Sequence, residues 1–334
     1  QKPAPEDKWT ALPWLLEQYN TAYAYSATLL QMQQSISRKH RERQSTLSYT
    51  YGGFAPSYNQ VGYKLTSTES LVNKVKRLLG GKTWCGINAS EENFKNSAPD
   101  CRILLLAMHG LADAENPELS RLLFGDPISG NLENDNVLYA GELQIMQLQA
   151  DLAILSACHS GFGKLRKGEG VFSLARAFAR AGVPATVMSL WLLNENTAAP
   201  LVLSFVQYLQ AGKSKDEALR LAKKDFLHDI KNANLSHPFF WAGVITSGDM
   251  CALDLPNSWF SWWWIGLGLL VLGISWYLIR RRKKQPEYFD IEYFMGGLLP
   301  SWEVYNSGSI SKASDVAPHW DEVSAHYEMP IDGD

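Results

Sequence analysis

The chain has 334 residues, of which 46% are hydrophobic and 19% charged, so it can bury a core and is not disordered or fibrous as a whole. Its net charge of −3 gives no reason to expect nucleic-acid binding. Four cysteines without Cys-x-x-Cys spacing exclude a disulfide scaffold and a four-thiolate zinc site, and no other feature requires a metal or cofactor.

Helix and turn signals organise the first hundred residues. Residues 52–60 are predicted to form a turn and loop because they hold adjacent glycines and a proline. Residues 69–79 have apolar side chains at helical spacing, and Gly80-Gly81 is expected to end that helix. Ser90, which precedes two glutamates, is expected to be the N-cap of the next helix. Cys85 and Cys101 could pair if this part of the protein is extracytoplasmic, but they are expected to be two unlinked thiols in the core.

Three apolar runs predict strands that are buried on both faces of a sheet. These runs are residues 103–108, 152–155 and 185–191. Helices are expected at 171–181, 197–210 and 214–227, between and after the last two runs. Alternating strands and helices predict an α/β domain with a mostly parallel sheet, spanning residues 1–250.

Residues 259–279 contain no charge, and as a helix they would be about 31 Å long, which is the thickness of a bilayer core. Four tryptophans cluster at the first end of this segment, and Trp276 and Tyr277 lie near the other end, as aromatic residues do at membrane interfaces. A buried core helix is the alternative. Because residues 280–284 are all Arg or Lys, the positive-inside rule favours a single-pass protein with a cytoplasmic C-terminal tail and an extracytoplasmic domain.

The last segment, residues 285–334, contains ten acidic residues and one lysine and has no helical or strand periodicity. Such a composition predicts disorder. The region 280–334 is therefore expected to be a basic run beside the lipid bilayer followed by an acidic, disordered tail.

Two reactive residue types directly follow neighbouring predicted strands. His109-Gly110 comes after the strand at 103–108, and Cys158 comes after the strand at 152–155. In open α/β sheets, catalytic groups gather at the carboxyl ends of the strands. A cysteine with its histidine about 50 residues upstream is also the caspase-type arrangement. A small buried hydrophobic side chain is the alternative role for Cys158.

Peptide cleavage by a thiol nucleophile is the chemistry for which a cysteine and a histidine are suited. A free thiol has a pKa near 8.5, so an imidazole with a pKa near 6.5 can accept its proton and later protonate the leaving amine. His109 is the expected base, and His159 is the weaker alternative because adjacent side chains usually point elsewhere. The N–H groups of Gly110 and Cys158 could form an oxyanion hole, where one donor typically contributes about 3–4 kcal/mol.

Four motifs resemble the CHAT domain, a caspase-like family often fused to tetratricopeptide repeats. They are His109-Gly110, ILSACHSGFG at 154–163, KGEGVFSLARAFARAGVPATVMSLW at 167–191 and HPFFWAGVITSGD at 237–249. The resemblance covers about residues 9–249. It implies a caspase-hemoglobinase fold and a cysteine endopeptidase that cleaves a protein substrate. It also implies His109 as general base, Cys158 as nucleophile, and control by an upstream repeat or sensor region of the same polypeptide.

The sequence departs from related proteins at two positions. In metacaspases, the residue two before the cysteine is an aspartate that helps bind a basic P1 side chain; here it is Ser156, so the same specificity does not follow. Glu195 stands where similar sequences often carry an acidic pair, and it is either part of a substrate pocket or a solvated residue at a helix start.

A second class of function is compatible with the same motifs. A membrane-anchored signalling scaffold would keep the fold and act by binding alone. The acidic tail and Ser156 favour it, whereas the presence of both His109 and Cys158 favours the protease. A channel or transporter is excluded because one spanning helix without an intramembrane charge provides no pathway.

Overall fold

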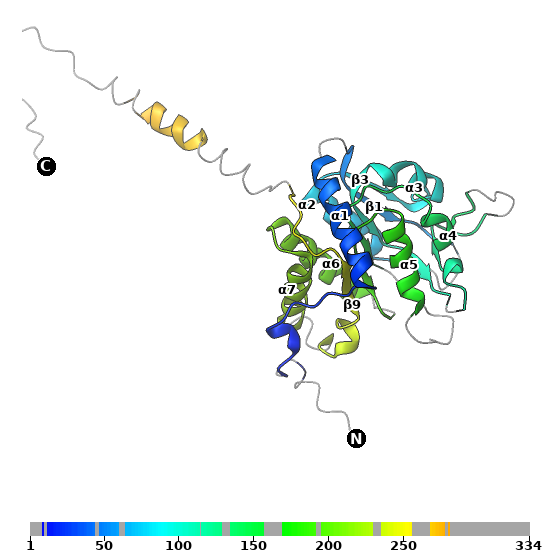
Figure 1. Ribbon diagram of the computed structural model, residues 1–334. Helices are drawn as coiled ribbons and strands as arrows, with labels where there is room; N and C mark the ends of the chain where they lie inside the picture. The colour runs from blue at the N-terminus through cyan, green and yellow to red at the C-terminus, as the bar shows by residue number, and fades with distance from the viewer. Residues whose placement is uncertain are drawn as a thin grey trace, which may run out of the picture. The chain divides into compact units, whose positions relative to one another are not determined.

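The structure is a computed structural model (Figure 1), and it describes residues 9, 12–43, 47–59, 64–113, 115–128, 134–156, 169–191, 195–229, 235–255, 268–277 and 280. The chain divides into two units, Gln1–Ser261 and Trp262–Asp334. The first unit contains every sheet and helix that positions the candidate site.

A six-stranded sheet with the order β2-β1-β3-β7-β8-β9 forms the centre of the first unit. All neighbouring strands are parallel except β8 and β9, which are antiparallel. This arrangement confirms the predicted α/β fold with a mostly parallel sheet. The strands are β1 (Tyr49–Ala55), β2 (Lys82–Cys85), β3 (Cys101–Leu106), β7 (Leu152–Leu155), β8 (Ala185–Ser189) and β9 (Val244–Gly248).

Helices cover both faces of this sheet (Figure 1), because side chains alternate between the two faces along each strand. On one face, Ile103 and Leu105 of β3 pack with α2, α6 and α7. On the other, Leu104 and Leu106 pack with α3, α4 and α5. The helices are α1 (Ala27–Arg43), α2 (Thr68–Leu79), α3 (Glu91–Ser97), α4 (Ala140–Leu143), α5 (Glu169–Arg180), α6 (Glu195–Gln210) and α7 (Lys215–His228).

A small antiparallel sheet with the order β4-β5-β6 follows directly on β3. It consists of β4 (His109–Leu111), β5 (Arg121–Leu123) and β6 (Val137–Tyr139). Short 3-10 helices join several of the elements: η2 (Leu15–Glu17), η4 (Gly86–Asn88), η5 (Ala98–Asp100), η6 (Pro117–Leu119) and η8 (Pro238–Phe240).

The predicted turn at residues 52–60 is wrong over its first four residues, because they belong to β1. Both glycines are needed for close packing rather than for a turn. A Cβ on Gly52 would lie 2.5 Å from Cys101 Sγ, and one on Gly53 would lie 2.2 Å from Tyr51 Oη. Ser90 is the N-cap of α3 as expected, and its Oγ accepts a hydrogen bond from the Asn93 N–H at 3.2 Å.

The hydrophobic segment 259–279 is described only in part. Residues 268–277 are helical, and their side chains are exposed. Among the helices that the structure describes, none has both the length and the apolar character needed to cross a bilayer. The predicted spanning helix is therefore not found there, and the predicted tail at 285–334 lies outside the described residues.

Candidate functional site

His109 lies just beyond the carboxyl end of β3, as the sequence predicts, and it begins β4. The turn between the two strands is held to β1, because the Ala107 N–H donates a hydrogen bond to the Phe54 C=O at 2.9 Å. His109 is 1% exposed. His109 is thus a buried residue at the carboxyl ends of the parallel strands, where the reactive groups of α/β proteins usually lie.

Ser156 lies at the same edge of the sheet. Leu155 at the end of β7 pairs with Leu106 at the end of β3, and the Ser156 N–H donates to the Leu106 C=O at 3.0 Å. Ser156 is half-buried. Cys158 and His159 lie outside the described residues, two and three positions further along the chain.

The other predicted site residues are Glu195 and Gly110. Glu195 is the first residue of α6, which fits a helix-start position, and its side chain is outside the described part of the structure. Gly110 is the middle residue of β4 and pairs with Leu122 of β5. The structure therefore brings His109, Gly110 and Ser156 to adjoining strand ends.

The backbone direction at Gly110 follows from the alternation of hydrogen-bonded pairs in antiparallel strands. The Phe124 N–H, one residue past β5, donates to the Asn136 C=O beside β6. Leu122, two residues earlier, directs its backbone groups to the same side, toward β6. Gly110, its partner in β4, is therefore left outside the β4–β5 hydrogen bonds, and its N–H points away from β5.

Tyr58 contacts His109, and sequence reasoning missed this contact. Its hydroxyl accepts a hydrogen bond from the His109 N–H at 3.1 Å and donates one to the Leu123 C=O at 2.6 Å. The two rings lie 4.6 Å apart between centroids, at an angle of 56°. Burial raises the pKa of Tyr58, so the hydroxyl keeps its proton. A lone tyrosine in a segment that the sequence predicts as turn and loop gives no signal that would reveal this contact.

Three cysteines are described, and all are free thiols: Cys85, Cys101 and Cys251. This confirms the expectation for Cys85 and Cys101. Burial raises the pKa of all three, that of Cys101 to about 12. Because a nucleophilic cysteine needs a lowered pKa, none of these three has the electrostatics of a nucleophile.

The opposite end of the same strands carries a buried ion pair. Arg102 Nε lies 2.7 Å from Asp151 Oδ2, and His40 Nδ1 lies 3.4 Å from Asp151 Oδ1. Burial acts to raise the pKa of Asp151, but the adjacent His40 and the hydrogen-bonded guanidinium of Arg102 outweigh it and leave the pKa below its usual value. The pair is structural, since it lies at the amino ends of β3 and β7.

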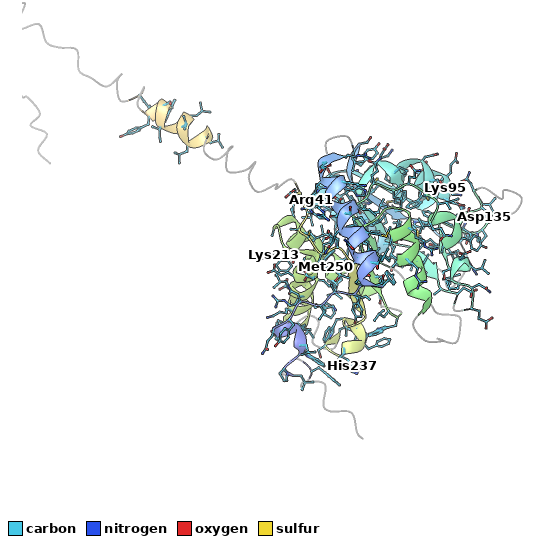
Figure 2. The ribbon with its side chains drawn as sticks, in the orientation of Figure 1. Arg41, Lys95, Asp135, Lys213, His237 and Met250 are labelled. Carbon is cyan, nitrogen blue, oxygen red and sulfur yellow. The ribbon has the colours of Figure 1, made fainter. Side chains whose placement is uncertain are left out.

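His237 lies among aromatic side chains. Its ring is 4.6 Å from that of Trp9, and its Nδ1 accepts a hydrogen bond from the Phe239 N–H at 3.1 Å. Figure 2 shows His237 at the end of the unit where the described N-terminal residues also lie. His237 thus makes packing contacts shortly before the chain enters β9. Within the described residues, no group of three His, Cys, Asp or Glu side chains could hold a metal ion.

Comparison with known proteins assigns the family. The family model described as the CHAT domain matches residues 4–249. The chain belongs to the CHAT domain family. The match covers the part of the chain that carries the central sheet, His109 and Ser156.

Curated relatives of this CHAT chain include tetratricopeptide repeat protein 28 from human and mouse. The human protein is 29% identical over 122 residues and the mouse protein 27% identical over 126 residues, which is 36% of this chain in both cases. The chain spans only 5% of the length of either relative. Their repeats are consistent with an association between CHAT domains and a repeat region.

Two solved structures are also similar to the CHAT chain. They are the complex of the RgpB pro- and mature domains of Porphyromonas gingivalis and the Arg-specific cysteine proteinase gingipain R. Each gives a TM-score of 0.37 at 10% identity, covering 62% and 61% of this chain and 49% and 47% of theirs. Similarity at this level carries no inference about the site.

Proposed function

We propose that residues 1–250 form a caspase-like cysteine endopeptidase in which His109 is the general base and Cys158 the nucleophile. One observation carries the proposal. The Ser156 N–H donates a hydrogen bond to the Leu106 C=O at the end of β3. Ser156, two residues before Cys158 in the chain, therefore lies beside the end of the strand that leads to His109. Membership of the CHAT domain family agrees with this assignment.

The proposed reaction is acyl transfer through the thiol. The imidazole of His109 takes the thiol proton of Cys158, and the thiolate attacks the carbonyl carbon of the scissile peptide bond. The imidazolium then gives its proton to the leaving amine as the C–N bond breaks, which leaves a thioester. Water, deprotonated by His109, hydrolyses the thioester and regenerates the thiol.

The oxyanion formed in each step needs donors that are not used elsewhere in the fold. The Gly110 N–H points away from β5, which supports its role as one such donor, together with the N–H of Cys158. Ser156 and Glu195 complete the proposed substrate pocket. Because Ser156 stands where metacaspases carry an aspartate, a preference for a basic P1 side chain does not follow from this position.

The remaining parts of the proposal rest on the sequence alone. Residues 259–279 anchor the protein in a bilayer as a single spanning helix, and residues 280–334 form the cytoplasmic tail. A repeat or sensor region of the same polypeptide controls the protease. The repeat-containing relatives support this last point.

Sequencing of newly formed protein N-termini tests the proposed activity in cells. Cells expressing the wild-type protein are compared with cells expressing Cys158→Ala, and the conservative Cys251→Ser variant serves as the control. We expect termini that appear with wild type and Cys251→Ser and are absent with Cys158→Ala. Identical sets of termini in all three, with the biological output preserved in Cys158→Ala, would instead establish the scaffold function.

A further inference from the structure

Tyr58 contacts His109 through both its hydroxyl and its ring, yet the proposed reaction gives it no role. Its side chain is 7% exposed. The hydroxyl bridges the first residue of β4 and the last residue of β5, because it accepts from the His109 N–H and donates to the Leu123 C=O. The tilted ring contact at 4.6 Å places the phenol directly against the imidazole.

Tyr58 is itself held on two sides. On one side it is held by β1, which it follows and which pairs with β3, the strand that leads to His109. On the other side it is held by Asn59, the next residue, whose N–H donates a hydrogen bond to Asp126 Oδ2 at 2.8 Å. The ring also packs in a small apolar cluster with Leu123 and Val137. A side chain anchored in this way can transmit its position to the residue it contacts.

We propose that Tyr58 is the positioning residue of the candidate active site and that it fixes the orientation of the His109 imidazole. The inference rests on the proposed function only in taking His109 as the base. The hydroxyl holds the backbone from which the imidazole projects, and the phenol ring limits the rotation of the imidazole. A general base must lie within hydrogen-bond reach of the proton that it accepts, so a loss of orientation slows proton transfer.

Tyr58→Phe separates the two contacts, because it keeps the ring and removes the hydroxyl. Tyr51→Phe is the matched control. Tyr51 is a fully buried tyrosine of the adjoining strand, and its hydroxyl also donates to a backbone carbonyl, that of Val72 at 3.1 Å. Both variants lose a buried hydroxyl that donates to a backbone carbonyl, but Tyr58→Phe alone loses a hydrogen bond with His109.

Nuclear magnetic resonance of the full chain with isotope-labelled histidine tests the positioning directly. His109→Gln identifies the His109 imidazole signals. We expect one sharp set of His109 signals in wild type and Tyr51→Phe, and split or broadened signals in Tyr58→Phe. A single sharp set in Tyr58→Phe would overturn the proposal, whether or not the protein is a protease.

Inactivation by an electrophilic peptide probe supplies the kinetic test. In Tyr58→Phe, the rate constant of covalent inactivation at saturating probe should fall about tenfold, whereas the probe concentration at half-saturation should not change. Tyr51→Phe should match wild type in both quantities. Equal rate constants in the two variants would contradict the positioning role. Absence of labelling in wild type would contradict the protease function instead, and the resonance experiment would still decide the role of Tyr58.

Discussion

Arg102 and Asp151 form a buried ion pair with 2.7 Å between Nε and Oδ2, and their backbones are joined as well, since the Asp151 N–H donates to the Arg102 C=O at 2.7 Å. Arg102 is the second residue of β3, and Asp151 immediately precedes β7. The two strands that lead to His109 and toward Cys158 are thus tied together at their amino ends.

Breaking this ion pair should lower the free energy of unfolding far more than removing a surface charge does. Arg102→Met leaves the Asp151 carboxylate buried without its guanidinium, for which a loss of about 3–5 kcal/mol in the free energy of unfolding is typical. Denaturant unfolding measures the loss. Arg77→Met, at an exposed arginine of α2, is the control and should change the free energy by less than about 0.5 kcal/mol. Equal losses in the two variants would contradict the assignment.

The burial of Lys223 in α7 should make the stability of the fold depend on pH. The side chain is 8% exposed, and burial lowers its pKa from 10.5 to about 8. Between these values the unfolded chain binds the proton more tightly than the folded protein, so stability rises with pH. Its contacts are the Ala242 C=O at 3.5 Å and the ring of Trp241, whose centroid is 6.0 Å away.

Lys223→Met should remove this dependence. At pH 7 the variant avoids the burial of a charge and should be more stable than wild type by about 1–3 kcal/mol. The free energy of unfolding, measured from pH 7 to pH 10.5, should converge for the two proteins as the pH rises. A wild-type protein that remains more stable than the variant at pH 7 would show that the ammonium group is stabilising.

Gly80 and Gly81, which end α2, offer a comparison between backbone strain and steric conflict. Both have positive φ angles, 76° and 83°. A Cβ on Gly80 meets nothing within 4 Å, whereas one on Gly81 would lie 2.1 Å from the Tyr51 O. Gly80→Ala should therefore cost about 1–3 kcal/mol from strain alone, and Gly81→Ala should cost distinctly more. Thermal and denaturant unfolding measure both losses, and equal losses in the two variants would show that the close packing of Gly81 against β1 is unimportant.

The proposed membrane anchor can be tested by fractionation of cells. Leu269→Arg combined with Leu272→Arg adds two charges near the middle of the hydrophobic segment, each costing about 2.5–3.5 kcal/mol on insertion. Wild type and the matched alanine double variant should remain with membranes after an alkaline wash, and the arginine variant should not. Release of wild type by the wash would refute the anchor.

The sequence predicts the core strands well because β3, β7 and β8 are buried on both faces and read as continuous apolar runs. It fails at β1, where two glycines that permit close packing resemble a turn. The three-residue strands β4, β5 and β6 are too short to show periodicity. Tyr58 escapes detection for a different reason, since its contact with His109 joins segments that are separated along the chain.

The central claim is that Cys158 reacts as a nucleophile because His109 activates it. Mass spectrometry of the chain treated with an electrophilic peptide probe measures this reaction at each cysteine. We expect labelling at Cys158 that falls at least about 100-fold in His109→Ala, while slow labelling of the exposed Cys251 is the same in both proteins. Labelling of Cys158 at the same rate in wild type and His109→Ala would contradict the account.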